Sequence, residues 1–294
     1  MNQTSNEALI GAAPEFRRKL NAARMVAPTD AAVLLIGEQG SGKERVAREI
    51  HRLSARAGGS FDIVTCAGMA ESDLDACLSG QSDGSGGSLF LDEVAELSGS
   101  AQARLLNLLA SHRAIGRRIL SGTTRDLAAE VDRGVFRQDL YYRLNVVPLD
   151  LPPLRERVQD IPALLRHFLD NAATLHGLKS PTLAAGAERL LRRYSWPGNV
   201  RELANLCERL AILFPGTLLM PENLPLEIRR GDRLTGGDVP LRLPPSGINL
   251  KELEVDLIRQ AIGLAGGNKS RAARLLGLSR DTLLYRMRKY LINA

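Results

Sequence analysis

"GEQGSGKE", residues 37–44, fits the pattern G-x-x-x-x-G-K and lies between an apolar run, "AVLLIG", and a helical segment, "ERVAREIHRLS". Glycines in such a loop let successive backbone N–H groups curl around phosphate oxygens, and the next helix adds the positive end of its dipole. Lys43 is placed to reach the outer phosphates. The stretch therefore predicts a phosphate-binding loop after a buried strand. Its expected nucleotide-binding residues are Gly37, Glu38, Gly40, Ser41, Gly42, Lys43 and Glu44.

An acidic pair ends a second apolar run, "SLFLDE", residues 88–93. Asp92 is suited to hold Mg²⁺, directly or through water, and Glu93 to orient a water that attacks a phosphate. An acidic pair at a strand end is also common as a plain solvated turn. Because a phosphate-binding loop lies upstream, the catalytic interpretation is preferred, with ATP and Mg²⁺ as the expected cofactors.

The pattern up to residue 153 alternates short apolar runs with helical segments, which is typical of a mostly parallel sheet covered by helices. Between residues 160 and 228 no strand is predicted, and three segments read as helices. The Gly- and Pro-rich residues 229–249 indicate a linker. We therefore expect an α/β core (1–153) with a helical lid (154–228), and an all-α C-terminal unit (250–294). The expected strands are residues 32–37, 61–66, 88–93, 118–123 and 144–151.

The formal net charge of +6 is concentrated near the C-terminus. Residues 268–290 contain seven Lys or Arg residues and one acidic residue, so the rest of the chain is neutral overall. A basic surface is often merely solvated. An excess confined to one short segment instead points to a polyanion, and double-stranded DNA is the expected partner.

The cysteines Cys66, Cys77 and Cys207 are odd in number and widely spaced, which argues against a disulfide framework and against a zinc site. No apolar run approaches the length of a membrane span, and the first residues, "MNQTSNEALIG", lack the features of a signal peptide. We therefore expect a cytoplasmic protein without a membrane partner.

Four longer stretches carry a family resemblance. They are "IGEQGSGKERVAREIH", "GGSLFLDEVAEL", "FRQDLYYRLNVVPLDLPPLRERVQDIPALLRHFL" and "WPGNVRELANLCERLAIL". Together they resemble the AAA+ ATPase module of bacterial enhancer-binding proteins, the activators of sigma-54 RNA polymerase. The resemblance covers nearly the whole chain and implies an AAA+ P-loop NTPase. Glu44 stands where a generic loop has the Ser or Thr that helps hold magnesium, and Glu is usual there in this family.

The resemblance also assigns roles to three arginines. Arg137 and Arg143 match arginines that reach into a neighbouring subunit's nucleotide site and stabilise transition-state charge. Arg201 matches the lid arginine that senses the bound nucleotide. The alternative for each is a surface arginine, which spacing alone does not reject. If these roles hold, hydrolysis requires a ring, expected to be a hexamer as in the family.

The C-terminal "GGNKSRAARLLGLSRDTLLYRMRKYLI" resembles the Fis-type helix-turn-helix that closes these regulators. Its small-residue helix, tight turn and second helix fit that motif, with Ser279 as the expected N-cap of the second helix. The first residues of that helix are expected to meet base edges in the major groove, and other basic residues to hold phosphates. The expected base-edge residues are Arg280, Thr282 and Arg286, and the expected phosphate contacts are Lys269, Arg271, Arg288 and Lys289.

The predicted helix over residues 250–264 has two apolar stripes. Such a helix either contacts a second copy of the chain, giving a dimer through the C-terminal unit, or is wedged within one subunit. The sequence favours neither. One stripe is Leu250, Leu253, Leu257, Ala261 and Leu264, and the other is Val255, Ile258 and Ile262.

The chain departs from the family at several positions. The family's long insertion with a Gly-Ala-Phe-Thr-Gly-Ala loop, which engages sigma-54, should lie between Cys77 and Ser88, where the chain has only "LSGQSDGSGG". The segment between "LLNLLASH" and "RRILSGT" is also shorter. Thr65 and Thr124 replace the Asn residues expected at two strand ends, so water positioning or signal relay should suffer. No receiver or ligand-sensing domain is expected ahead of the ATPase module.

Three functions remain open. The first is a DNA-binding transcription regulator that binds ATP, hydrolyses it slowly and does not remodel sigma-54. The second is an active ATP-hydrolysing sigma-54 activator, against which the missing loop argues. The third is an inert DNA-binding scaffold, or an antagonist that assembles with a full-length relative. RNA polymerase is an expected partner in each regulatory reading, in a form that the sequence does not specify.

Overall fold

The computed structural model describes residues 9–69, 86–110, 116–230, 250–266, 268–290 and 292. They belong to two compact units, one within residues 1–232 and one within residues 233–294, and each unit is described by itself. None of the described helices combines the length and the apolar character of a membrane span. Most of the polar stretch ahead of the acidic pair, the shortened second segment and the predicted linker lie outside the described residues.

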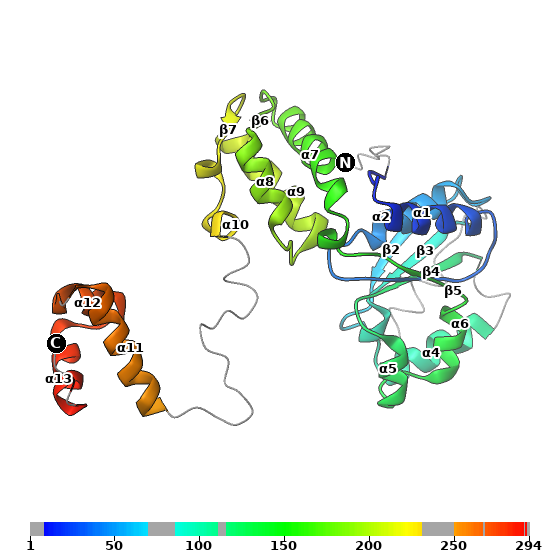
Figure 1. The fold of residues 1–294 in the computed structure, drawn as a ribbon. Helices are drawn as coiled ribbons and strands as arrows, with labels where there is room; N and C mark the ends of the chain where they lie inside the picture. Colours follow the sequence, from blue (N-terminus) through cyan, green and yellow to red (C-terminus); the bar gives the residue numbers. More distant parts are fainter. Residues whose placement is uncertain are drawn as a thin grey trace. The chain divides into compact units, whose positions relative to one another are not determined.

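Five parallel strands form the centre of the first unit (Figure 1). Their order is β2-β3-β4-β1-β5, which places β1, the strand before the phosphate loop, between β4 and β5. Leu34, Leu89 and Leu120 are fully buried because helices cover both faces of the sheet. The α/β class and all five expected strands are confirmed. Their bounds are β1 (Val33–Ile36), β2 (Phe61–Thr65), β3 (Ser88–Asp92), β4 (Arg118–Thr123) and β5 (Val147–Asp150).

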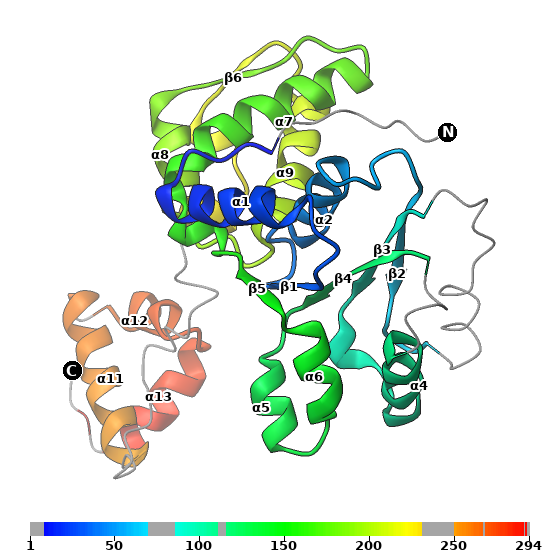
Figure 2. The same ribbon diagram turned by 90° about the vertical axis from the view of Figure 1, so that its right-hand side faces the viewer.

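Helices α1 and α2 cover one face of this sheet, and α4, α5 and α6 cover the other (Figure 2). Val33 and Leu35 of β1 pack with α1 and α2, whereas Leu34 packs with the helices of the other face, as the alternation of side chains along a strand requires. The bounds are α1 (Pro14–Val26), α2 (Lys43–Arg52), α4 (Gly99–Ala110), α5 (Leu127–Asp132) and α6 (Gln138–Leu144), with a short 3-10 turn η1 (Val94–Glu96).

The lid follows β5 and is built around helices α7 and α9, which pack along each other (Figure 1). The expectation of no strand in this region is wrong in one detail, because two-residue strands β6 and β7 pair in parallel. Strands of that length have no periodic pattern that a sequence reveals. The bounds are α7 (Ile161–Leu175), β6 (Thr182–Leu183), α8 (Ala185–Arg193), α9 (Asn199–Leu213), β7 (Leu218–Leu219) and α10 (Leu226–Arg230), with 3-10 turns η2 (Leu154–Glu156), η3 (Val158–Asp160) and η4 (Pro221–Asn223).

The second unit consists of α11 (Leu250–Leu264), α12 (Lys269–Leu275) and α13 (Arg280–Lys289). Side chains cap both short helices: Asn268 accepts from the Ser270 and Arg271 N–H groups, and Ser279, as expected, accepts from the Thr282 N–H at 3.1 Å. The Asn268 cap fixes the start of α12, and the Ser279 cap fixes the turn between α12 and α13.

The two apolar stripes of α11 have different surroundings within this unit. Ile258 and Ala261 are buried in the core of the unit with Leu283 of α13. Leu257 and Leu264 are exposed, at 44% and 74%. The helix therefore uses one apolar side for its own unit and presents leucines on another.

Candidate functional site

The predicted phosphate-binding loop lies between β1 and α2. Gly40 and Gly42 adopt positive φ angles of 74° and 107°, which L-residues with side chains rarely adopt, so glycine is required at both turns. No side chain caps α2, so its first-turn N–H groups are left for a ligand. The buried Lys43 donates from Nζ to the Gly37 carbonyl oxygen at 2.9 Å, inside the loop.

The acidic pair ends β3 beside this loop. Burial, and secondly the neighbouring Glu93 carboxylate, raise the pKa of Asp92. A divalent cation would favour the ionised form of such a carboxyl, so Asp92 fits the magnesium position expected for it. Glu93 has a φ of +58°, a strained conformation for this residue, and its Oε1 lies 3.1 Å from Lys43 Nζ.

The other oxygen of Glu93 is held by Thr124. The Thr124 N–H donates to Glu93 Oε2 at 2.9 Å and its hydroxyl at 2.8 Å. Thr65, at the end of β2, is exposed and its side chain makes no hydrogen bond with any described residue. Sequence reasoning treated both threonines only as losses, and it missed this contact of Thr124.

The lid contacts the phosphate loop through its backbone. A Cβ on Gly40 would come within 2.3 Å of the Gly198 carbonyl oxygen, and the Val200 N–H donates to the Gly40 carbonyl oxygen at 3.0 Å. The absence of a side chain at Gly40 therefore lets the lid backbone pack against the loop.

Side chains strengthen this contact. Asn199, fully buried and with a φ of +51°, donates from Nδ2 to Glu38 Oε2 and to the Gln39 carbonyl oxygen, both at 3.0 Å, and accepts from the Leu154 N–H at 2.7 Å. Arg155 donates to both Glu38 carboxylate oxygens, at 2.8 and 2.6 Å, and lowers the pKa of Glu38. The Glu38 side chain, expected to bind nucleotide, is thus engaged with the lid.

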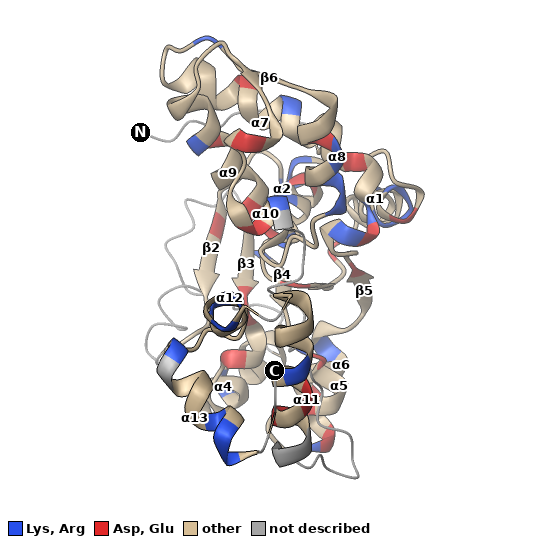
Figure 3. Ribbon diagram, turned by 60° about the vertical axis from the view of Figure 1, so that its left-hand side comes forward, with Lys and Arg blue, Asp and Glu red and all other residues tan. Residues whose placement is uncertain are grey.

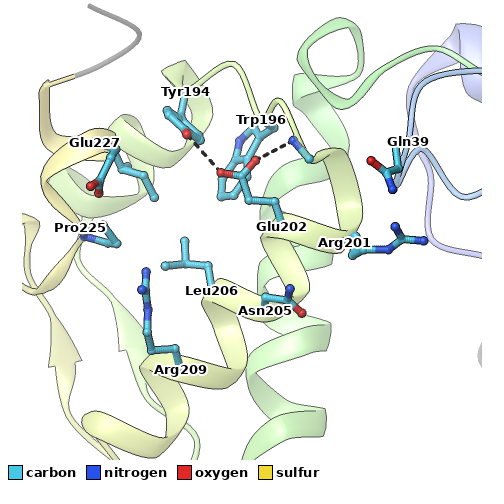
Figure 4. A pocket seen from close by; sticks show the side chains of 12 residues that line it. Gln39, Tyr194, Trp196, Arg201, Glu202, Asn205, Leu206, Arg209, Pro225 and Glu227 are labelled. Carbon is cyan, nitrogen blue, oxygen red and sulfur yellow. Dashed lines mark hydrogen bonds between the residues drawn. The ribbon is translucent and has the colours of Figure 1, made fainter. Parts of the chain in front are cut away.

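A pocket of about 640 Å³ extends from the phosphate loop along α9 (Figure 4). Gln39 of the loop and Arg201 of α9 lie side by side at one end, so the predicted lid arginine is adjacent to the loop. Glu202 orders the turn before α9, because its two oxygens accept from the Tyr194 hydroxyl at 3.1 Å and from the Gly198 N–H at 2.9 Å.

Buried polar groups also gather where the N-terminal segment, the loop and the start of the lid meet. Arg157 donates to the Ser41 carbonyl oxygen at 2.6 Å and lies 4.3 Å from the Phe16 ring centroid, and burial lowers its pKa to about 10. Asp160 Oδ1 accepts from two N–H groups of residues 12 and 13. Ser41 Oγ, Arg157 Nε and Asp160 Oδ2 are buried and have no hydrogen-bond partner among the described residues. Polar atoms of this kind fit a site that takes a polar ligand or water.

Three further expected residues lie on the surface of the first unit. Arg137 pairs with Asp139 at 2.7 Å, and Arg143 donates to the Leu109 carbonyl oxygen at 3.0 Å. Neither makes a hydrogen bond to the phosphate loop of its own chain. Glu44 is exposed at the start of α2 and pairs with Arg48 at 2.9 Å.

Lys and Arg residues lie along α12 and α13 of the second unit (Figure 3). Arg280 is exposed at the start of α13, and Thr282, two residues further on, contacts the Ser279 cap. The phosphate contacts expected at Lys269, Arg271, Arg288 and Lys289 come from the same two helices, at exposed or half-buried positions.

Arg286 contacts another helix of its own unit. Its guanidinium pairs with Glu254 of α11, and Glu254 Oε2 also accepts from the Tyr290 hydroxyl at 2.6 Å. This pair holds α11 against α13, so the base-reading role expected at Arg286 requires the pair with Glu254 to open. Tyr285, which sequence reasoning did not single out, is 67% exposed on α13. The sequence feature that could have identified Tyr285 is its position two residues after Leu283, which is buried.

The fold and the site define a P-loop NTPase of the AAA+ class that carries a helix-turn-helix unit. Three family descriptions match: Sigma-54 interaction domain at residues 10–154, AAA+ ATPase lid domain at 155–237, and Bacterial regulatory protein, Fis family, at 249–290. The chain is 40% identical to the transcriptional regulatory protein ZraR of Klebsiella oxytoca over 95% of its length and 68% of the relative's. The chain belongs to the family of sigma-54-dependent transcriptional regulators, as its motifs predicted.

Two other relatives agree with this assignment. The DNA-binding transcriptional regulator NtrC of Bradyrhizobium is 36% identical over 95% of this chain and 69% of its own. A solved structure of NtrX from Brucella abortus in complex with ATP is 31% identical, with a TM-score of 0.70 over 96% of this chain and 69% of that one. These neighbours support a nucleotide-binding AAA+ module.

Proposed function

We propose that the chain is a DNA-binding transcription regulator in which ATP binding controls self-assembly, and which does not remodel sigma-54. The proposal rests on a contrast between the nucleotide site and the polar stretch that precedes its acidic pair. Lys43, Asp92 and Glu93 form a nucleotide site with the residue types that phosphoryl transfer needs. The ten Gly- and Ser-rich residues just before it offer neither the reach nor the apolar tip of a remodelling loop.

We assign a separate role to each residue of the nucleotide site. Backbone N–H groups of the loop and Lys43 bind phosphates, Asp92 holds Mg²⁺, and Glu93 orients water. Arg201 senses the nucleotide from the lid, since it lies beside the loop. Arg137 and Arg143 act on the site of the next subunit in a ring, a hexamer by analogy with the family, and their lack of hydrogen bonds to their own loop supports this.

The C-terminal unit binds double-stranded DNA as a dimer. Arg280 and Thr282, at the start of α13, meet base edges, while Lys269, Arg271, Arg288 and Lys289 contact phosphates. Exposed Leu257 and Leu264 of α11 supply the apolar contact between two copies. RNA polymerase is the partner on which the bound regulator acts.

Transcription in vitro tests this function. The full chain is added to sigma-54 holoenzyme and, separately, to the main housekeeping holoenzyme, each with Mg-ATP and a promoter that the chain binds. We expect no activation of the sigma-54 form. ATP-dependent open-complex formation by that form would overturn the proposal and establish an active sigma-54 activator, which family membership favours.

Thermal unfolding with Mg-ATP tests the nucleotide part. Saturating ligand is expected to raise the melting temperature by about 5–10 °C, because ligand at a hundred times its dissociation constant stabilises a protein by roughly 2.7 kcal/mol. Lys43→Ala should abolish the shift. An unchanged melting temperature for the unaltered chain at every ATP concentration would instead favour the inert scaffold.

A further inference from the structure

Tyr285 is an aromatic residue at the centre of the outer face of α13. Leu283 and Met287 are buried in the core of the second unit, so they mark the inner side of this helix. Successive residues of an α-helix are about 100° apart, so Tyr285 points about 180° away from the midline of that inner side. The side chain is 67% exposed. The helix therefore presents this ring on the face opposite its core.

The neighbours of Tyr285 on this outer face are residues expected to contact DNA. Thr282 lies three residues before it, and Arg288 and Lys289 lie three and four residues after it, so all three are adjacent to it on the helix surface. Arg288 and Lys289 are exposed, like Tyr285. The outer face of α13 thus places one apolar ring between a base-reading position and two cations suited to phosphates.

Two of the three polar residues expected to read bases have partners within the unit. Arg286 pairs with Glu254 of α11, and the Thr282 hydroxyl lies 2.7 Å from Ser279 Oγ. These contacts must open or be shared before either side chain bonds a base. Arg280 is exposed at the start of the helix. Sequence readout by this helix therefore calls for a contact that depends less on hydrogen bonds.

The direction of a helical side chain brings the Tyr285 ring towards the part of α13 that reads bases. Such a side chain leans over the turn on the N-terminal side of its own Cα. In a helix-turn-helix, the N-terminal residues of the second helix are the ones that meet base edges in the major groove. The apolar group that base pairs show in this groove is the 5-methyl group of thymine.

We propose that Tyr285 determines sequence specificity by packing its ring against the 5-methyl group of a thymine in each half-site. This inference rests on the proposed binding of double-stranded DNA. The contact discriminates because cytosine at the same position has no methyl group and shows an amino group instead. Arg288 and Lys289 hold the neighbouring phosphates, which carry no sequence information themselves.

The probe for the test is a duplex that the full chain, without ATP, selects from a random-sequence library. Each thymine is then replaced with uracil at the same place in both half-sites, which removes the methyl group and keeps every base-pairing hydrogen bond. We expect one such replacement to weaken binding about fourfold per half-site, the value of one buried methyl group, and so about 15-fold for two half-sites.

Substitutions at Tyr285 assign this effect to its ring. Tyr285→Ala should bind the thymine and uracil duplexes within about twofold of each other, because the contact is already lost. Tyr285→Phe keeps the ring and should keep the full preference for thymine. The decrease of affinity with salt should have the same slope in Tyr285→Ala as in the unaltered chain, since no phosphate contact is removed.

Tyr142→Ala is the matched control, at a tyrosine of the first unit that is 64% exposed, and should bind both duplexes like the unaltered chain. A uracil effect of the same size in Tyr285→Ala would assign the methyl contact to another residue and overturn the proposal. An equal loss of the thymine preference in Tyr285→Phe would also overturn it, because the phenol hydroxyl and not the ring would then be responsible.

The same measurements separate this inference from the function on which it rests. If the unaltered chain enriches no duplex from the library, the proposed DNA binding is wrong and the inference fails with it. If the chain binds a selected duplex and binds all its uracil forms equally well, DNA binding stands and the role of Tyr285 is refuted.

Discussion

His51 is a buried titratable residue at the end of α2. Its Nδ1 lies 2.9 Å from Ser88 Oγ, its ring is 5.3 Å from the Phe61 ring, and it is 8% exposed. Burial, and then the charges of Arg118 and Arg48, lower its pKa below the usual 6.5. The folded chain therefore holds a neutral imidazole at a pH where the unfolded chain already binds a proton.

This shift predicts a loss of stability in mild acid. As the pH falls through 6.5 towards the lower folded pKa, the free energy of unfolding should decrease, by at most about 1.4 kcal/mol per pH unit from this one group. His51→Gln keeps a polar partner for Ser88 and should flatten the pH dependence. Urea unfolding followed by the fluorescence of Trp196, the single tryptophan, measures it.

The exposed His176, which lies 3.2 Å from Glu208, supplies the control. His176→Gln should leave the acid slope as it is in the unaltered chain. Identical slopes for the unaltered chain and His51→Gln would contradict the assignment.

Single residues show why only part of the site could be predicted from the sequence. Lys43, Asp92 and Glu93 stand in short linear motifs, because each must follow a particular strand or loop. The Thr124–Glu93 bond and the Asn199–Glu38 bond join residues 31 and 161 positions apart. No local pattern encodes such pairs, since they exist only once the strands and the lid are packed.

At the scale of elements, prediction succeeded for the strands of the central sheet, which are four to six residues long. β4 was expected at residues 118–123 and has those bounds, and all six of its residues are buried although Arg118, Ser121 and Thr123 are polar. β6 and β7 are too short for any pattern. The two apolar stripes expected on α11 do not separate in the structure: Leu257 and Leu264 of the first stripe are exposed, whereas Ala261 of the same stripe is buried with Ile258 of the second.

The contact of α11 with α13 depends on one carboxylate. Glu254 accepts from the Tyr290 hydroxyl and pairs with Arg286, and the first of these contacts contributes most to its lowered pKa. Glu254→Gln removes the charge, so we expect α13 to be held less firmly against α11. Hydrogen exchange in peptides from residues 250–290 should therefore be faster. The stabilisation should also fade in acid, as the pH falls through the pKa of Glu254, because the ionised form makes both contacts.

Asp256 on the same helix is a matched control. Among the described residues its Oδ2 accepts from Gln260 of α11 alone, at 2.7 Å, so Asp256→Asn should leave exchange in α13 unchanged. Equal exchange in Glu254→Gln and the unaltered chain would show that Arg286 is free to leave α11, and would restore it as a candidate for base contacts.

At the scale of the whole molecule, the excess positive charge and the nucleotide site lie in different units. The net charge of +6 arises within residues 268–290, so DNA affinity belongs to the second unit and should fall steeply with salt. The first unit contributes no net charge and carries the nucleotide site. In the proposed function, self-assembly couples the two units, because two copies of a helix-turn-helix bind two half-sites together.

The exposed leucines of α11 make this coupling testable. Leu264, 74% exposed, has no role in the core of its own unit, so Leu264→Asp should leave the fold intact while it removes apolar contact between copies. We expect a shift from dimer towards monomer in sedimentation and at least a tenfold loss of affinity for a two-half-site duplex, with little loss for a single half-site. Leu175→Asp, at an exposed leucine of α7, is the control for surface charge and should change neither. A Leu264→Asp chain that remains dimeric and binds the two-half-site duplex at full strength would mean that α11 is not the dimer contact and that the ATPase module alone brings the copies together.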